Sequence, residues 1–264
     1  MIPRKIHYCW FGSQEKSQNV KECMATWPLK TDYLIKEWNE TNCDFSANKF
    51  VRQAVEQKKW AFVSDYFRLV ALYNEGGIYL DTDVELTRNF DTLLTEKFFV
   101  GYIFDSSIGT AVMGSVKHHR ILGDLIDLYE EAYWDDDYKN FYVKRFGNIN
   151  FTCNNDLLTY YLKTEYSDFK LNGKTQHLND FSVYSKEEFE IGPIIGKKHA
   201  LHRCEGSWKD DKDSRKKIIS SSIKRMAARI PLINVESCIR HTTYAKKMKN
   251  ERFYDLYLRD TENK

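Results

Sequence analysis

Hydrophobic and polar positions along the first hundred residues follow two periods, and this pattern predicts a layered fold of strands and helices. Strands are expected at residues 4–12 and 33–38, and helices at residues 19–27 and 48–58. In residues 60–86 an apolar helical stripe ends at two glycines and is followed by a short apolar strand. The stripe consists of Val63, Tyr66, Phe67, Val70 and Tyr73. Alternation of this kind indicates an α/β fold, in which ligands bind at the carboxyl ends of strands.

The later pattern is less regular. It predicts a strand at 98–104, helices at 120–133 and 154–162, an extended segment at 181–184 and a strand entering a loop at 200–208. A basic helix with an apolar stripe is expected at 212–229. The sequence shows no internal repeat, so we expect a catalytic domain over residues 1–211 and a basic helical extension, residues 212–264, packed on the same domain.

Composition places the chain among globular proteins and shows an uneven distribution of charge. Of its 264 residues, 42% are hydrophobic and 30% charged, and the net charge is +2. From Lys212 onward, 14 Lys and Arg face 6 Asp and Glu. The acidic remainder suits a bound cation, and the basic part suits phosphates or an anionic membrane surface.

The same sequence favours a cytoplasmic location. It has no apolar run of the roughly 20 residues that a membrane span needs, and its first residues do not resemble a signal peptide. The six cysteines show no C-x-x-C spacing, which favours reduced thiols over disulfides.

Two carboxylates, Asp81 and Asp83, follow the apolar strand at 78–80. Residues two apart in a strand share one side, so both side chains are expected to face the same ligand. Oxygen ligands in this arrangement suit a divalent cation that holds a diphosphate. The alternative is an acidic turn after a strand, without a ligand.

Other polar and aromatic residues remain open between a functional and a structural role. Asp65 and Arg68, three residues apart on a helix, form either a surface ion pair or polar groups of a sugar pocket. Trp10 either stacks on a nucleobase or packs in the core. His202, close in sequence to Ser207 and Trp208, is a candidate metal ligand. We interpret His7 as a core histidine.

Taken together, these motifs resemble glycosyltransferase family 32, whose members include capsular and surface polysaccharide synthesis proteins and distant relatives among the clostridial glucosylating toxins. The matching segments are I-H-Y-C-W-F-G at residues 6–12, the whole of residues 60–86, and H-x-x-x-G-S-W at residues 202–208. The resemblance implies a GT-A fold, a Rossmann-like nucleotide-sugar-binding fold, with a helical C-terminal region. It also implies a divalent metal, usually Mn²⁺ and otherwise Mg²⁺, and transfer with retention of anomeric configuration.

The resemblance also implies roles for individual residues. On the donor it places Trp10 at the base, Ser64, Asp65 and Arg68 at the sugar, with Tyr79 beside them, and Asp81 at the ribose. The metal is assigned to Asp81, Asp83 and His202, and the diphosphate and leaving oxygen to Ser207 and Trp208. The residues expected to carry catalysis are Asp65, Arg68, Asp83 and Trp208.

The chain departs from the family pattern at two places. Many relatives have a second histidine where Arg203 stands, which points to His202 as the relevant ring. Many also have a T-G-P-type acceptor turn where residues 153–155 read C-N-N. Asn154, Asn155 and Asp156 are therefore only candidates for the acceptor side.

The predicted function is a metal-dependent hexosyltransferase that uses a nucleotide sugar, in the first place a UDP-sugar. Its acceptor would be a glycan or a lipid-linked oligosaccharide, with possible peripheral contact with an anionic membrane and no nucleic-acid partner. One alternative is a haloacid-dehalogenase-like phosphatase, which would need Asp81 as nucleophile. Another is a non-catalytic protein that binds nucleotide sugars or glycans. P-loop, serine-hydrolase and zincin patterns are absent from the sequence.

Overall fold

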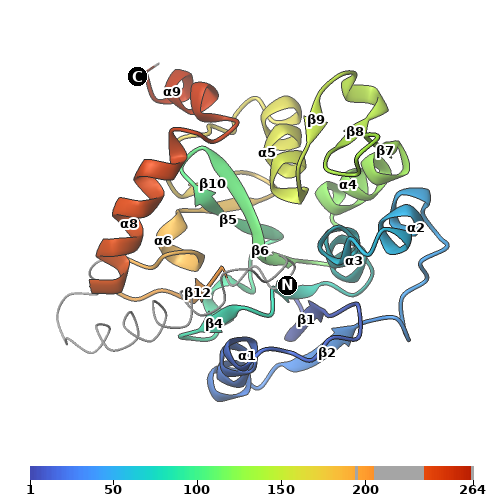
Figure 1. The fold of residues 1–264 in the computed structure, drawn as a ribbon. Helices are drawn as coiled ribbons and strands as arrows, with labels where there is room; N and C mark the ends of the chain where they lie inside the picture. Colours follow the sequence, from blue (N-terminus) through green and yellow to red (C-terminus); the bar gives the residue numbers. More distant parts are fainter. Residues whose placement is uncertain (194–195, 205–234, 263–264) are drawn as a thin grey trace.

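The computed structural model describes residues 1–193, 196–204 and 235–262. Its centre is a mixed seven-stranded sheet with the strand order β10-β11-β5-β6-β3-β1-β2 (Figure 1). The strands of this sheet are β1 (Lys5–Cys9), β2 (Leu34–Trp38), β3 (Gly77–Leu80), β5 (Phe98–Phe104), β6 (Ser107–Ser115), β10 (Gln176–His177) and β11 (Ser182–Tyr184).

Two smaller sheets accompany the central one. They consist of β4 (Val84–Leu86) with β12 (Ala200–His202), and of β7 (Ala132–Trp134), β8 (Phe141–Val143) and β9 (Asn150–Phe151). The helices of the described residues are α1 (Gln18–Lys30), α2 (Lys49–Glu56), α3 (Trp60–Glu75), α4 (Arg120–Glu130), α5 (Asn154–Glu165), α6 (Lys186–Phe189), α8 (Val235–Met248) and α9 (Tyr254–Glu262).

Both faces of the central sheet are covered, and each covered face has its own hydrophobic core. Successive residues of a strand point to opposite faces, so Tyr79 joins one core while Ile78 and Leu80 join the other. Helices α2, α3, α4 and α5 contribute to the first core, and α1, β4 and the end of α6 to the second. This α/β layered arrangement confirms the predicted class and agrees with the GT-A fold that the resemblance implies.

The strand that leads to the two candidate carboxylates is fixed on both sides. Strands β1, β2 and β3 run parallel, with Ile6 opposite Ile78 and His7 opposite Tyr79. The carboxyl ends of β1 and β3 therefore meet at one edge, which brings Trp10 and Asp81 to the same edge of the sheet. On the other side, β3 pairs antiparallel with β6.

His7 has the structural role expected of a core histidine. Its ring is fully buried, the carbonyl oxygen of Gly76 accepts a hydrogen bond from Nε2 at 2.8 Å, and Trp38 Nε1 donates to Nδ1 at 3.0 Å. Burial lowers the pKa of His7 to about 4. The ring is thus a neutral bridge that ties β2 to the end of α3.

The C-terminal helices pack on the remainder of the molecule. On α8, the Ser237 hydroxyl donates to the carbonyl oxygen of Ile191 at 3.0 Å. On α9, Asp260 pairs with Lys163 of α5 at 2.7 Å. Figure 1 shows α8 and α9 along one side of the molecule, in red. The predicted domain boundary at residues 211 and 212 and the predicted basic helix at 212–229 lie outside the described residues.

Some expectations about elements need correction. The helix predicted to run to Tyr133 ends at Glu130, and residues 132–134 form β7, which pairs with β8. The sequence analysis also did not predict β4, β6, β8, β9, β10 or α6, whereas α8 and α9 lie in the region that was expected to be helical.

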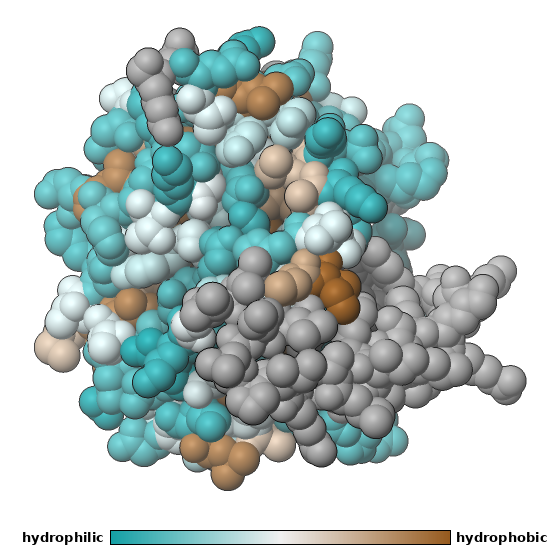
Figure 2. Space-filling view, turned by 90° about the vertical axis from the view of Figure 1, so that its left-hand side faces the viewer, coloured by the Kyte–Doolittle hydropathy of each residue, from teal (hydrophilic) through white to brown (hydrophobic). Residues whose placement is uncertain are grey.

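On the face in Figure 2, hydrophobic groups are small and separated by hydrophilic ones. Among the described residues, no helix has the length and apolar character needed to cross a bilayer. All six cysteines are recorded as thiols, as the sequence analysis expected.

Candidate donor-binding and metal site

The two acids lie in a turn between β3 and β4 rather than on one strand. Residues 82–83 form the turn, and the backbone N–H of Val84 donates to the carbonyl oxygen of Asp81 at 3.0 Å. We expected strand alternation to place both carboxylates on one side of the chain. The two side chains do lie together, but strand alternation is not the cause. The turn itself brings the two side chains together, and β4 then continues into a second sheet.

Pairing between β4 and β12 places His202, which is distant in sequence, beside these acids. His202 is the antiparallel partner of Val84, the residue directly after Asp83. His202 Nε2 lies 3.3 Å from Asp83 Oδ1, and each side chain is 13% exposed. The position of β4 is in turn fixed by Trp27, whose indole donates to the carbonyl oxygen of Val84 at 2.8 Å.

Asp81, Asp83 and His202 form a group whose ligand atoms all lie within 4.8 Å of one another. Two carboxylates and an imidazole are a donor set that suits Mn²⁺ and fits Mg²⁺ through its oxygens. The three residues that the sequence analysis assigned to a metal thus converge, and their chemistry fits the cation that the resemblance implies.

A buried charge network joins this group from the side of α3. The Arg68 guanidinium lies 2.9 Å from Asp65 Oδ1 and 3.4 Å from Asp81 Oδ1. It also donates to the carbonyl oxygen of Thr110 at 2.8 Å and lies 4.7 Å from the Tyr79 ring centroid. The Tyr79 hydroxyl donates to Asp81 Oδ1 at 3.0 Å. Arg68 and Tyr79, which are assigned to the donor sugar, therefore contact Asp81 in the turn that carries the two acids.

Burial and charge act in opposite directions on these groups. Burial raises the pKa of Asp65 to about 6, and Arg68 together with the Asn154 backbone N–H limits the rise. Burial alone would lower the pKa of Arg68, but Asp81, Tyr79 and Asp65 hold it above its ordinary value. The surface ion pair considered for Asp65 and Arg68 is excluded, because their side chains are 11% and 6% exposed.

His202 lies between carboxylates on both sides of its ring. Burial lowers its pKa, but Cys204, Glu190 and Asp83 together hold the pKa well above its ordinary value. Glu190 Oε2 accepts from Nδ1 at 2.8 Å, opposite the Asp83 contact at Nε2. A carboxylate on the distal nitrogen is the usual device that orients a metal-ligating histidine.

The structure also places the remaining predicted residues. The Trp10 ring is half-buried, and its indole donates to the carbonyl oxygen of Gln14 at 2.8 Å. Ser64 lies one residue before Asp65, and its carbonyl oxygen accepts from Arg68 Nε at 3.3 Å. Ser207 and Trp208 lie outside the described residues.

The acceptor candidates do not form one group. The Asn154 backbone N–H donates to Asp65 Oδ2 at 3.1 Å, and Asn155 Oδ1 accepts from the Thr110 hydroxyl at 2.7 Å. Both asparagines therefore adjoin the Asp65–Arg68 network. Asp156 instead accepts from the Thr152 hydroxyl at 2.6 Å and pairs with Arg252 at 3.8 Å, so its contacts lie apart from that network.

Several contacts at this site were not predicted. Glu190, Thr110 and Tyr244 stand in no motif, and the folded chain brings them to His202, Arg68 and Glu190 respectively. Arg203, where relatives carry a second histidine, donates through Nε to Glu85 at 2.9 Å. With Arg203 paired to Glu85, the ring beside Asp83 is that of His202.

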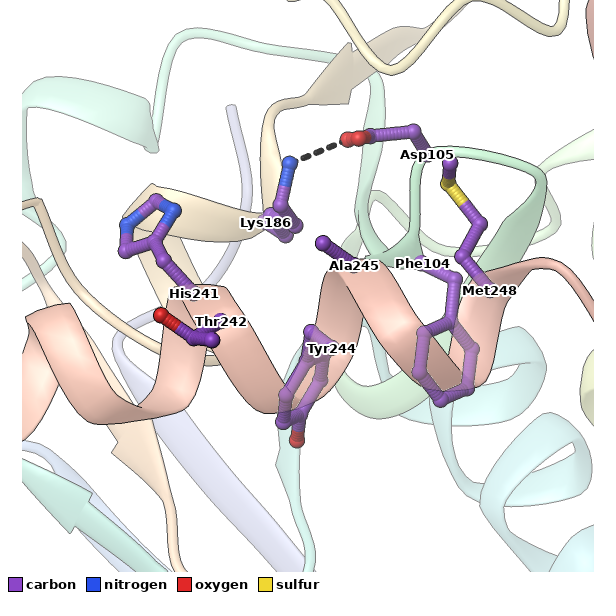
Figure 3. A pocket seen from close by; sticks show the side chains of 8 residues that line it. All are labelled: Phe104, Asp105, Lys186, His241, Thr242, Tyr244, Ala245 and Met248. Carbon is purple, nitrogen blue, oxygen red and sulfur yellow. Dashed lines mark hydrogen bonds and ion pairs between the residues drawn. The ribbon is translucent and has the colours of Figure 1, made fainter.

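A cavity of about 390 Å³ lies beside α8, separate from the residues assigned to the donor. Figure 3 shows Lys186 and Asp105 paired on one side of α8, with the Tyr244 side chain pointing away from that pair. The lining consists of Phe104, Asp105, Lys186, His241, Thr242, Tyr244, Ala245 and Met248. None of the residues assigned to donor or metal is among them.

Comparison with known proteins agrees with this geometry. Residues 13–100, which include both acids of the turn, match the family described as glycosyltransferase sugar-binding region containing DXD motif. This part of the chain is thus similar to the DXD-type sugar-binding regions of glycosyltransferases. The resemblance stated from the sequence is confirmed at the level of that family.

A curated relative carries the same region. Inositol phosphoceramide mannosyltransferase 3 of Schizosaccharomyces pombe is 30% identical over 125 residues, which cover 46% of this chain and 35% of the relative. The match thus spans about a third of the relative's length.

Solved glycosyltransferase structures show only a general likeness. PaToxG glycosyltransferase aligns at a TM-score of 0.47 and 19% identity, over 63% of this chain and 70% of its own. GlyE of Streptococcus pneumoniae TIGR4 aligns at 0.47 and 13%, over 94% and 64%. A glycosyltransferase that modifies the major capsid of PBCV-1 aligns at 0.41 and 11%, over 82% and 98%. At these scores the alignments do not define an activity.

Proposed function

We propose that this protein is a metal-dependent, retaining glycosyltransferase that transfers a hexose from a nucleotide sugar, in the first place a UDP-sugar. The acceptor would be a hydroxyl of a glycan or lipid-linked oligosaccharide, in the synthesis of a surface polysaccharide. The observation that carries the proposal is the convergence of Asp81, Asp83 and His202, with ligand atoms within 4.8 Å. The match of residues 13–100 to a glycosyltransferase sugar-binding region supports it.

The chemical difficulty of the reaction is the departure of a diphosphate from the anomeric carbon. A divalent cation held by Asp81, Asp83 and His202 would neutralise the charge that develops on the leaving group. The protein's own part is to position the two acids and the ring, and the turn, the β4–β12 pairing and Glu190 support this positioning.

Positioning of the donor sugar is assigned to Asp65 and Arg68, with Ser64 at their side. The guanidinium is held by Asp65, Asp81 and Thr110, so its orientation is set before a donor binds. Asp65 is likewise held, by Arg68 and the Asn154 backbone. Such preorganisation lowers the entropy that must be lost when sugar and acceptor are aligned.

The remaining donor contacts are proposed by resemblance. Trp10 stands at the sheet edge shared with Asp81 and is proposed to stack on the base. Ser207 and Trp208 are proposed to contact the diphosphate and the leaving oxygen, and Asn154 and Asn155 to face the acceptor. Peripheral contact with an anionic membrane and a cytoplasmic location stay predictions.

The test is a panel of UDP- and GDP-sugars screened with the full chain for Mn²⁺-dependent release of the nucleoside diphosphate. We expect release from one or a few UDP-sugars and its loss on chelation of the metal. Phosphate release from simple phosphomonoesters with no sugar-nucleotide turnover would instead support the phosphatase. Binding of UDP without any turnover would indicate a non-catalytic protein.

A further inference from the structure

A second set of metal-ligating atoms meets on the other side of the His202 ring. Cys204 Sγ lies 3.3 Å from Glu190 Oε1 and 3.6 Å from His202 Nδ1, and Glu190 Oε2 lies 2.8 Å from the same Nδ1. One ligand atom from each of Glu190, His202 and Cys204 lies within 4.8 Å of the other two. The set shares His202 with the acid turn, but it replaces both aspartates by a thiol and a different carboxylate.

The chemistry of this second set differs from that of the first. A thiol, an imidazole and one carboxylate are the ligands of Zn²⁺ and similar thiophilic cations, whereas Mn²⁺ and Mg²⁺ favour oxygen. Bonds of about 2.0–2.3 Å at tetrahedral angles place neighbouring ligand atoms about 3.3–3.6 Å apart. Both sulfur distances fall in that range. Only the Glu190–His202 hydrogen bond would lengthen, by roughly 0.5 Å, when a cation takes its place.

The surroundings hold the set in place. Glu190 is 4% exposed, and the Tyr244 hydroxyl contacts its Oε1 at 2.5 Å and Cys204 Sγ at 3.4 Å. Arg240 donates to the carbonyl oxygen of His202 at 2.7 Å. Helix α8 thus supports all three ligands from one side.

Cys204 itself is constrained and accessible. Its φ of 53° lies in the left-handed region, which a non-glycine residue adopts at a cost and where functional residues concentrate. Its exposure lets a cation from solvent reach the thiol.

We propose that Glu190, His202 and Cys204 form a binding site for a thiophilic divalent cation such as Zn²⁺, and that a cation bound there excludes the donor cation. The exclusion rests on the proposed function, whereas the binding site does not. A neutral imidazole has one N–H and one lone pair. When Nδ1 binds the thiophilic cation, the proton on Nδ1 and the thiol proton leave to solvent, and the ring keeps one proton, on Nε2. Nε2 then donates to Asp83 and no longer binds a cation beside it.

Co²⁺ is the probe for the site, because a bond between cobalt and a thiolate gives a charge-transfer absorption in the near ultraviolet. Titrating the full chain with Co²⁺ should produce this band in the wild type and in Cys43→Ser, whose thiol lies elsewhere in the chain. Cys204→Ser should abolish the band. Glu190→Gln should weaken Co²⁺ affinity by about 10–100-fold. Asp83→Ala, which alters only the donor set, should keep the band.

The second arm measures antagonism between the two cations. With sugar-nucleotide turnover at fixed Mn²⁺, Zn²⁺ should inhibit, excess Mn²⁺ should relieve the inhibition, and Cys204→Ser should need at least about tenfold more Zn²⁺. A Co²⁺ band that is absent, or that persists in Cys204→Ser, would overturn the site. Inhibition unchanged in Cys204→Ser would overturn the exclusion. If no donor is turned over at all, the proposed function fails while the absorption still decides the cation site.

Discussion

Asp65 and Arg68 form an ion pair inside the protein, with Arg68 Nη2 at 2.9 Å from Asp65 Oδ1 and side chains only 11% and 6% exposed. Asp81 adds a second carboxylate to the same guanidinium at 3.4 Å. The Arg68 guanidinium thus balances the charges of two carboxylates in a region with little access to water. Asp65, Arg68 and Asp81 therefore depend on one another for the stability of the fold as well as for the proposed donor contacts.

Arg68→Ala should therefore be strongly destabilising. It leaves two carboxylates without their cation, and removing one partner of a buried pair costs about 3–5 kcal/mol. The matched control is Arg120→Ala, because Arg120 pairs with Asp124 on a helix surface, with side chains 73% and 32% exposed. Arg120→Ala should lower the free energy of unfolding by only about 0–1 kcal/mol. Urea unfolding of both variants measures the difference, and equal losses would contradict the account of a buried network.

The stability of the protein should carry the signature of Asp65 between pH 4 and pH 6. Its folded pKa, about 6, lies above the ordinary value of 3.8. Folding therefore favours the protonated acid, and the stability this contributes is complete below about pH 3.8 and lost as pH rises through 6. We expect the difference in unfolding free energy between wild type and Asp65→Asn to fall over that interval. A difference independent of pH would be inconsistent with the raised pKa.

Asp83→Ala should remove sugar transfer while leaving the fold intact. A ligand of the donor cation contributes several kcal/mol to stabilising the leaving group, so turnover should fall by at least about a hundredfold. Asp137→Ala is the control, since its carboxylate is 70% exposed in a surface pair with Lys139. Turnover of the variants and their far-ultraviolet circular dichroism are the measurements. Full activity in Asp83→Ala would defeat the assignment of the acid turn.

The sequence predicted the parts of the site that depend on neighbouring residues. Asp81 and Asp83 are two apart, and Asp65 and Arg68 three apart on one helix, so local pattern made them candidates, and the family resemblance gave them their roles. The helix α3, the strand β3 and the glycines between them were also predicted. Local pattern does not reveal how deeply Asp65 and Arg68 are buried. Only the structure could decide between a surface ion pair and a buried one.

The contacts that were missed depend on pairing across long distances. Strand β4 has three residues and β12 has three, too few to show a period. Their pairing sets His202 beside Asp83, a position that only the resemblance suggested. Glu190 follows a four-residue helix and precedes no motif, so nothing in the sequence connects it to the imidazole.

Gly77→Ala should test how tightly the start of β3 is held. Gly77 has a φ of 110°, and a Cβ there would lie 2.7 Å from the carbonyl oxygen of Lys5 on β1. Backbone strain and this clash together should cost at least about 2 kcal/mol. Gly147 also has a positive φ, 63°, but a Cβ there would meet nothing within 4 Å. Gly147→Ala should therefore lose less stability in the same thermal unfolding experiment, and equal losses would mean that the contact with β1 is unimportant.

Binding to anionic vesicles tests the predicted contact with a membrane. Removing the whole chain from Lys212 onward would not isolate charge, because Tyr244 and Arg240 of α8 hold Glu190 and the His202 backbone. Lys246 and Lys247, exposed in the last turn of α8, can be changed without touching those contacts.

If α8 lies on the membrane, Lys246→Gln with Lys247→Gln should weaken binding to phosphatidylserine vesicles by roughly 30-fold. Each basic residue near such a surface contributes about 1 kcal/mol, and added salt should reduce the effect. Lys139→Gln with Lys144→Gln removes the same charge from exposed positions elsewhere. Vesicle sedimentation that shows no binding by the wild type, or equal binding by both double variants, would rule out this helix as the contact.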